Sequence, residues 1–395
     1  MLKVLKNQGG IILIELALWL SLITLAVFGS GIELYYNVAP CLCLLSILFV
    51  IKRHLRLSSL MRLFVFFCII TFISSYNFFF HFKNSHNYIN YFSYSILGYV
   101  VAIGAYCFVN GHDDRMKIIY YFYCIFLLIG IFRFARSTTQ VAEFMQNNAF
   151  YYVLTPLPIL LYGTKKQFLQ IILLSIVSLV CIISMKRSAL IGVGLIWLLF
   201  IIFSVSKNKN KKKNIKYIFI IIFFLLFIIQ YLDSKLNLSF YIDRVSTRMQ
   251  NIENDGGSGR IDIIDSFFKD DISDLLSFPN LIIGNGFEGY LNKTHGLLTS
   301  LHNDFLEVFY SLGLLGLGSL IYFYILLLKN SLSIDNEYSS LKLAYSSLLL
   351  LFLLYSMVGS NFNYFFNSLP LFLGLGALES IRKRKKLRIR EVINL

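Results

Sequence analysis

The sequence predicts an all-α, polytopic membrane protein with about 12 transmembrane helices and one large outer loop that contains an amphipathic helix. Hydrophobic residues make up 57% of the 395-residue chain and charged residues only 14%, whereas about a quarter of a typical soluble domain is charged. The apolar residues form runs of about 20, the length of a helix that crosses a bilayer. Because helices satisfy their own backbone groups in lipid, we expect a single integral membrane domain over residues 1–395.

Twelve apolar segments predict the spans. In chain order they cover residues 11–30, 34–51, 61–80, 88–110, 116–133, 149–163, 167–184, 188–206, 216–232, 303–328, 341–359 and 364–380. The segment 149–163 is the weakest of them, because it is short and contains Pro156 and Pro158. No internal repeat is visible in the sequence, which disfavours an inverted-repeat transporter.

The distribution of basic residues predicts the orientation of the chain. With the N-terminus in the cytoplasm, the cytoplasmic segments hold more than twice as many Lys and Arg residues as the outer segments. Cytoplasmic loops of membrane proteins carry this excess, so we expect both termini to be cytoplasmic. The net charge of +15 is therefore a topology signal, and nucleic acid is not an expected partner. The six cysteines all fall in predicted spans without a CxxC pair, which disfavours a disulfide or zinc framework.

One outer loop, residues 233–300, separates the ninth and tenth predicted spans. Unstructured loops longer than about 12–15 residues are uncommon in compact domains and are usually functional. The stretch GGSGRIDIIDSFFKDDISDLLSF, residues 256–278 of this loop, predicts an amphipathic helix, because Ile261, Ile264, Phe268, Ile272 and Leu275 recur at helical spacing.

Arg260 stands at the start of that predicted helix, where the helix dipole disfavours a cation unless an anion joins it. A glycine-rich approach, free N–H groups and a guanidinium together suit a phosphate. An exposed Arg260 paired with Asp262 or Asp265 explains the pattern equally well.

Other outer basic residues extend this hypothesis. Lys186 and Arg187 lie in a very short turn between two apolar spans, where charges are often functional. Arg187 is the better ligand because its planar fork matches phosphate oxygens, although either side chain could instead snorkel to lipid headgroups. Arg244 and Arg248 add positive charge on the same side, so several arginines facing one cavity would suit a pyrophosphate.

The stretch TSLHNDFLEVFYSLGLLG, residues 299–316, places His302, Asn303, Asp304 and Glu307 at the outer end of the tenth span. The partial positive charge of a helix N-terminus favours a neutral imidazole, which can accept a proton. A capped or solvated histidine is the simpler alternative, and His295 in the large loop is a competitor.

Two further patterns bear on the chemistry. Asn285 lies between Gly284 and Gly286, which predicts a turn that brings backbone close to a ligand. The outer segments lack HExxH, DxD and clustered metal-ligand spacings, and a GxSxG elbow is also missing. We therefore expect no metal and no cofactor.

Four stretches of the chain, taken in order, resemble the O-antigen polymerase and ligase superfamily, mainly over residues 180–380. They are SMKRSALIG, SGRIDIIDSFF, IGNGF and LHNDFLEVFYSLGLLG. The resemblance implies a GT-C-like glycosyltransferase of the bacterial inner membrane. Its substrate would be an undecaprenyl-pyrophosphate-linked oligosaccharide at the periplasmic face. Membrane lipids and a chain-length regulator protein are the implied partners.

The resemblance also implies residue roles. Residues that match Arg187, Arg260 and His302 are functional in the ligases of the family. We expect Arg187 and Arg260 to bind the pyrophosphate and His302 to deprotonate or orient the acceptor hydroxyl. Asp304 is a rival base, and Asn303 and Glu307 would hold the histidine or the sugar. Lys186 departs from the family, which usually has a small polar residue there, while Arg248 and Gly259 fit an Arg-x10-Gly pattern of some polymerases.

We expect a polymerase. A ligase that transfers the glycan to the lipid A core shares nearly all these features. A glycolipid flippase is less favoured, because it needs charged residues inside spans and the sequence offers only Glu15 and Glu33 near such positions.

Overall fold

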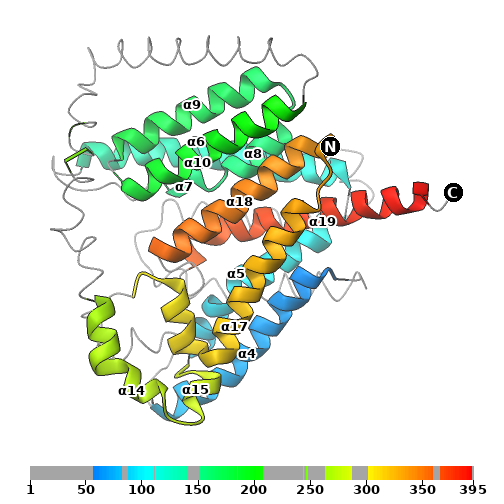
Figure 1. Ribbon diagram of the computed structural model, residues 1–395. Coiled ribbons are helices and arrows are strands. Elements are labelled where there is room, and N and C mark those ends of the chain that lie inside the picture. The colour runs from blue at the N-terminus through cyan, green and yellow to red at the C-terminus, as the bar shows by residue number, and fades with distance from the viewer. Residues whose placement is uncertain are drawn as a thin grey trace. The chain divides into compact units, whose positions relative to one another are not determined.

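The computed structural model describes residues 57–81, 88–110, 112–140, 151–184, 186–207, 263–286, 301–358 and 365–393, together with Asp243, Ser246 and Thr247. Every regular element in these ranges is a helix (Figure 1). The elements are α4 (Ser59–His81), α5 (Tyr88–Val109), α6 (Asp113–Gln140), α7 (Tyr151–Leu154), α8 (Leu157–Gly163), α9 (Gln167–Ile183), α10 (Arg187–Lys207), η2 (Phe267–Asp271), α14 (Ile272–Leu275), α15 (Asn280–Ile283), α17 (Asp304–Leu332), η3 (Asn336–Tyr338), α18 (Ser339–Val358) and α19 (Phe365–Ile393).

By length and composition alone, three of the described helical segments are long and apolar enough to cross a membrane, namely Asp113–Ala135, Asp304–Leu332 and Asn336–Val358. The described helices follow nine of the twelve predicted spans, and the segment 149–163 divides into α7 and α8. The predicted spans 11–30, 34–51 and 216–232 lie outside the described residues. The helical class is therefore confirmed, while the number of spans and the orientation stay predictions.

The chain divides into two compact units. The first contains residues 1–122, 260–329 and 355–395, and the second contains residues 123–259 and 330–354. Several helices therefore contribute to both units.

Aromatic side chains form the core of the first unit. Phe67 of α4 stacks on Tyr99 of α5 with ring centroids 5.0 Å apart, and Tyr99 meets the edge of Phe372 of α19 at 5.8 Å. Helices α5 and α19 approach closely, since a Cβ atom at Gly376 would fall on the carbonyl group of Ala102. Glycine at this position therefore sets the distance between the two helices.

In the second unit, small residues and hydrogen-bonding side chains join the helices. Gly130 of α6 lies against the Tyr152 backbone of α7, and the Arg133 guanidinium lies 4.7 Å from the centre of the Tyr152 ring. The Trp197 indole of α10 donates a hydrogen bond of 2.9 Å to the Ser178 hydroxyl of α9.

Helix α17 of the first unit is not the single straight span that the sequence predicts. Gly313 has φ 63° and ψ −159°, which are not helical angles, so the element consists of two arms. The rings of Phe305 and Tyr324 nevertheless stack with centroids 5.8 Å apart. Nineteen residues of continuous helix would separate them by about 28 Å.

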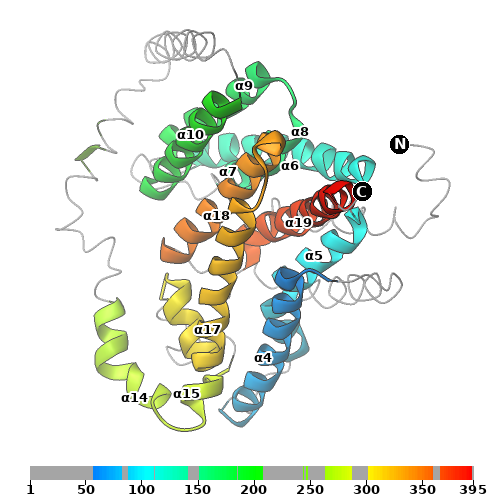
Figure 2. The same cartoon turned by 45° about the vertical axis from the view of Figure 1, so that its right-hand side comes forward.

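The two arms of α17 therefore form a helical hairpin with Gly313 at its tip. The short arm, residues 304–312, lies beside the long arm, residues 314–332, in both views (Figures 1 and 2). The apolar run 303–328 is thus folded back on itself, and the prediction of one continuous tenth span is wrong. This reversal places Asp304 beside Tyr324 instead of at the outer end of a straight helix.

The predicted amphipathic helix of the large loop also differs in detail. Residues 263–275 are helical, but Phe267–Asp271 is a π-helical turn in which the Ile272 N–H bonds to the Phe267 carbonyl. The extra residue in this turn rotates the later side chains by about 100°, which brings Phe267 and Leu275 to one face. Phe267 is therefore buried, while Phe268, the residue expected on the apolar face, is 50% exposed.

Candidate functional site

The candidate site is built on the start of the short arm of α17. The side-chain oxygen of Asn303 accepts hydrogen bonds from the N–H groups of Phe305, at 3.0 Å, and Leu306, at 3.2 Å. Asparagine is among the preferred residues at this N-cap position, because it satisfies N–H groups that lack helical partners. Asn303 therefore starts the short arm.

Glu307 fixes the chain on the other side of this cap. It is 3% exposed, and its carboxylate accepts a hydrogen bond of 2.6 Å from the N–H of Leu301, itself fully buried. The side chain thus reaches back over the cap to the residue that precedes His302. Asn303 and Glu307 together hold residues 301–303 in one conformation.

Asp304 lies in a buried hydrogen-bonded chain. Its side chain is 0% exposed, and its Oδ2 accepts a bond of 2.5 Å from the Ser356 hydroxyl near the end of α18. The Ser356 oxygen accepts in turn a bond of 2.6 Å from the hydroxyl of Tyr324 on the long arm. Burial of a carboxylate is costly unless such donors compensate it. Asp304 therefore ties the two arms of the hairpin to α18.

His302 differs from both carboxylates. It is partly exposed, and its backbone has φ 51°, an uncommon angle for residues other than glycine. Non-glycine residues persist in this region only where the surroundings impose it, and they cluster at active sites. The neighbouring cap and the Glu307 bond supply that constraint here. Of the three sequence-predicted catalytic residues, His302 alone has a side chain that is not buried.

The turn at Asn285 docks on the tip of the hairpin. Because the helix breaks at Gly313, the carbonyl groups of Tyr310 and Ser311 are available to other donors, and they accept hydrogen bonds from the N–H groups of Asn285, at 2.9 Å, and Gly286, at 3.1 Å. The predicted turn is present, with φ 79° at Gly284 and 97° at Gly286.

The glycines at this contact are needed for close approach of two backbones. A Cβ atom at Gly284 would fall on the Ser311 carbonyl group, and one at Gly313 would fall on that of Ile282. The turn therefore fixes the hairpin tip, while its closeness to a ligand stays a prediction. The Nδ2 atom of Asn285 is buried without a hydrogen-bond partner.

The described part of the large loop packs on the short arm as well. Phe267, Leu275, Leu301 and Tyr310 form a buried cluster, in which the rings of Phe267 and Tyr310 lie 5.9 Å apart. The loop, the hairpin tip and the histidine segment are thus one packed assembly within the first unit.

The structure describes two of the predicted pyrophosphate ligands. Lys186 and Arg187 are half-buried, and α10 begins at Arg187. The carbonyl of Lys186 accepts hydrogen bonds from the N–H groups of Ala189, at 3.1 Å, and Leu190, at 3.3 Å. Both residues belong to the second unit. Arg244, Arg248 and Arg260 lie outside the described residues, so the convergence of these arginines near His302 stays a prediction.

Within the described ranges, no group of three or more His, Cys, Asp or Glu side chains is placed to hold a metal ion. Sequence reasoning missed two members of the buried chain, Tyr324 and Ser356. The sequence gives little indication of these two residues, because hydroxyl groups within apolar spans often bond to carbonyl groups of their own helix. Only the reversal at Gly313 brings Tyr324 next to Asp304.

The described fold and site define a class, an all-helical protein whose long apolar helices suit a membrane and whose polar cluster lies on a reversed helix. In comparisons with known proteins, neither a family model nor a curated sequence matches this chain.

Proposed function

We propose that the protein is a membrane glycosyltransferase that polymerises O-antigen repeat units carried on undecaprenyl pyrophosphate at the periplasmic face of the inner membrane. The observation that supports this proposal best is the constrained, partly exposed His302, which directly precedes the helix start that carries the buried carboxylates Asp304 and Glu307. A rigid support of this kind holds a general base in position. The sequence resemblance supplies the substrate class.

The proposed reaction needs one base and one anion-binding group. His302 takes the proton from a hydroxyl group of the acceptor sugar, and the oxygen of that hydroxyl attacks the anomeric carbon of the donor glycan. The bond between this carbon and the pyrophosphate oxygen breaks, and undecaprenyl pyrophosphate leaves with the electron pair. Arg187 and Arg260 would stabilise the charge that develops on the leaving group.

The buried carboxylates have supporting roles in this proposal. Asp304 and Glu307 already accept hydrogen bonds from Ser356 and from the Leu301 backbone. An acceptor sugar would have to displace these bonds to reach either carboxylate. His302 is therefore preferred over Asp304 as the base, a choice that the sequence left open.

An O-antigen ligase remains the nearest alternative, because it uses the same donor and the same leaving group. A flippase is favoured by one observation that the sequence did not predict. The structure buries Asp304, Glu307 and Glu379 among helices, and buried acidic residues of this kind often line transport pathways. Glu379, however, is paired with Arg382 through two contacts of 2.7 Å.

Deletion of the gene distinguishes these three functions. Lipopolysaccharide from the deletion strain is separated on a gel and compared with that of a strain complemented by the wild-type gene. Loss of the long ladder with retention of the core plus one repeat unit supports the polymerase. Loss of every repeat unit rejects the polymerase in favour of a ligase or a flippase.

A further inference from the structure

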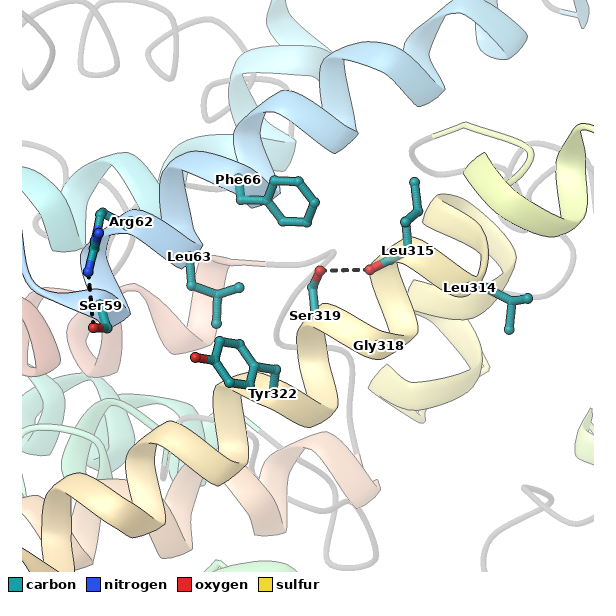
Figure 3. Close-up of a pocket in the computed structure, with 9 residues that line it drawn as sticks. All are labelled: Ser59, Arg62, Leu63, Phe66, Leu314, Leu315, Gly318, Ser319 and Tyr322. Atoms are coloured by element: carbon teal, nitrogen blue, oxygen red, sulfur yellow. Dashed lines mark hydrogen bonds between the residues drawn. The ribbon is translucent and has the colours of Figure 1, made fainter.

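A groove runs between α4 and the long arm of α17 within the first unit (Figure 3). Its volume is about 570 Å³, which is within the range of about 300–1,000 Å³ for ligand sites. The groove has two chemically different parts. Leu63, Phe66 and Leu315 form an apolar part, and Arg62 with the Ser59 hydroxyl forms a polar end.

Several side chains of the apolar part are exposed on the outer surface of the helices. Phe66 is 42% exposed, Leu314 49% and Leu315 40%. The hydroxyl of Ser319 bonds to the carbonyl of Leu315 at 2.7 Å, so it adds little polarity to this wall. Around a helix that crosses a membrane, these surfaces face hydrocarbon, and an acyl chain is the chemical match for them.

The polar end carries the positive charge of Arg62, whose Nη2 atom donates a hydrogen bond of 3.3 Å to Ser59. None of the described residues that line the groove is Asp or Glu. Arg62 lies in the first turn of α4, where the helix dipole disfavours a cation but favours an anion. A phosphate there would satisfy both the helix terminus and the planar guanidinium.

We propose that this groove binds one anionic phospholipid, with its phosphate at Arg62 and one acyl chain along Phe66 and Leu315. A headgroup that carries its own ammonium would add a second cation beside Arg62, whereas an anionic headgroup would not. The basic residues Lys52, Arg53 and Arg56 precede this end in the sequence, which predicts that it faces the cytoplasm. The groove shares no residue with the His302 segment, so this proposal does not depend on the proposed glycan chemistry.

Native mass spectrometry of the purified, delipidated full-length protein tests the charged end. We expect one tightly bound phosphatidylglycerol and weaker binding of phosphatidylcholine. Arg62→Gln should weaken phosphatidylglycerol binding about tenfold or more, because a charged hydrogen bond is lost. The matched control is Lys117→Gln, which removes an exposed lysine that is already paired with Asp114 at 2.8 Å. The control should bind phosphatidylglycerol as the wild type does.

A second pair of variants tests the apolar part independently of charge. A Cβ atom at Gly318, which lines the groove, would meet nothing within 4 Å, so Gly318→Leu adds apolar volume to the groove without a clash at Cβ. The same is true of Gly194 on α10, outside this groove, which makes Gly194→Leu the matched control. We expect Gly318→Leu to lose phosphatidylglycerol binding and Gly194→Leu to retain it.

Three outcomes would overturn the proposal: equal binding of the two phospholipids by the wild type, unchanged binding in Arg62→Gln and Gly318→Leu, or preference for a polyprenyl phosphate over phosphatidylglycerol. Size-exclusion profiles of all four variants should match that of the wild type, so that a loss of binding reports on the groove.

Discussion

Gly313 offers the sharpest test of the hairpin, because its backbone angles exclude other residues. At φ 63° and ψ −159° it occupies a region that is essentially restricted to glycine, where another residue costs about 1–3 kcal/mol. A Cβ atom would also fall on the carbonyl group of Ile282, and relief of such overpacking typically costs about 1–3 kcal/mol more. Gly313→Ala should therefore destabilise the protein by about 2–6 kcal/mol.

Gly318, five residues after Gly313 on the long arm, provides the matched control. A Cβ atom there meets nothing within 4 Å, and replacement of a helical glycine by alanine gains up to about 1 kcal/mol. Gly318→Ala should therefore be as stable as the wild type or slightly more so.

Both variants can be compared by titration of the detergent-solubilised protein with sodium dodecyl sulfate, with helix content followed by circular dichroism. The free energy of unfolding should fall in Gly313→Ala only. Equal stability of the two variants would refute the reversal at Gly313, because a continuous helix accepts alanine at both positions.

Two further predictions concern the interior of the hairpin. Ser356→Ala removes the hydrogen-bond donor to buried Asp304 and should lower the free energy of unfolding by about 1–3 kcal/mol in the same titration. Ser333→Ala, the control at an exposed side chain, should change the free energy of unfolding little. Equal effects of the two substitutions would mean that the Asp304 contact adds nothing to stability. In a chain without its native cysteines, cysteines introduced at positions 305 and 324 should cross-link with a short bifunctional reagent, because the native rings of Phe305 and Tyr324 lie 5.8 Å apart. Absence of a cross-link would favour a straight helix, which separates the two positions by about 28 Å.

The helices themselves were largely predictable from the sequence. Apolar runs of the right length locate α4, α5, α9 and α10, since helix is the local solution for such a run in lipid. The reversal within α17 was not predictable in this way. Residues 305–328 are predominantly apolar, with Glu307 as their one charged residue, and a glycine within a span is ordinary. The positive φ of Gly313 depends on the Gly284 turn, which is distant in sequence.

The candidate site was predicted in composition but not in geometry. The sequence grouped His302, Asn303, Asp304 and Glu307 correctly, because adjacent residues must lie together. The sequence alone could not predict which of these side chains is buried, since burial of Asp304 depends on Ser356 from another helix. The π-helical turn in the large loop also could not be predicted from the sequence, and it buries Phe267 instead of Phe268. Such insertions change which face is buried without changing the helical pattern of the sequence.

The measurement that tests the central claim most directly is elongation of a lipid-linked oligosaccharide by the purified protein. Wild type and His302→Ala are incubated with undecaprenyl-pyrophosphate-linked repeat units in the presence of EDTA, and the products are separated by length. The proposal predicts longer glycans with the wild type and a loss of about 10²–10⁴-fold in rate with His302→Ala, at an unchanged unfolding midpoint. No elongation by the wild type, or an equal rate in His302→Ala, would contradict it.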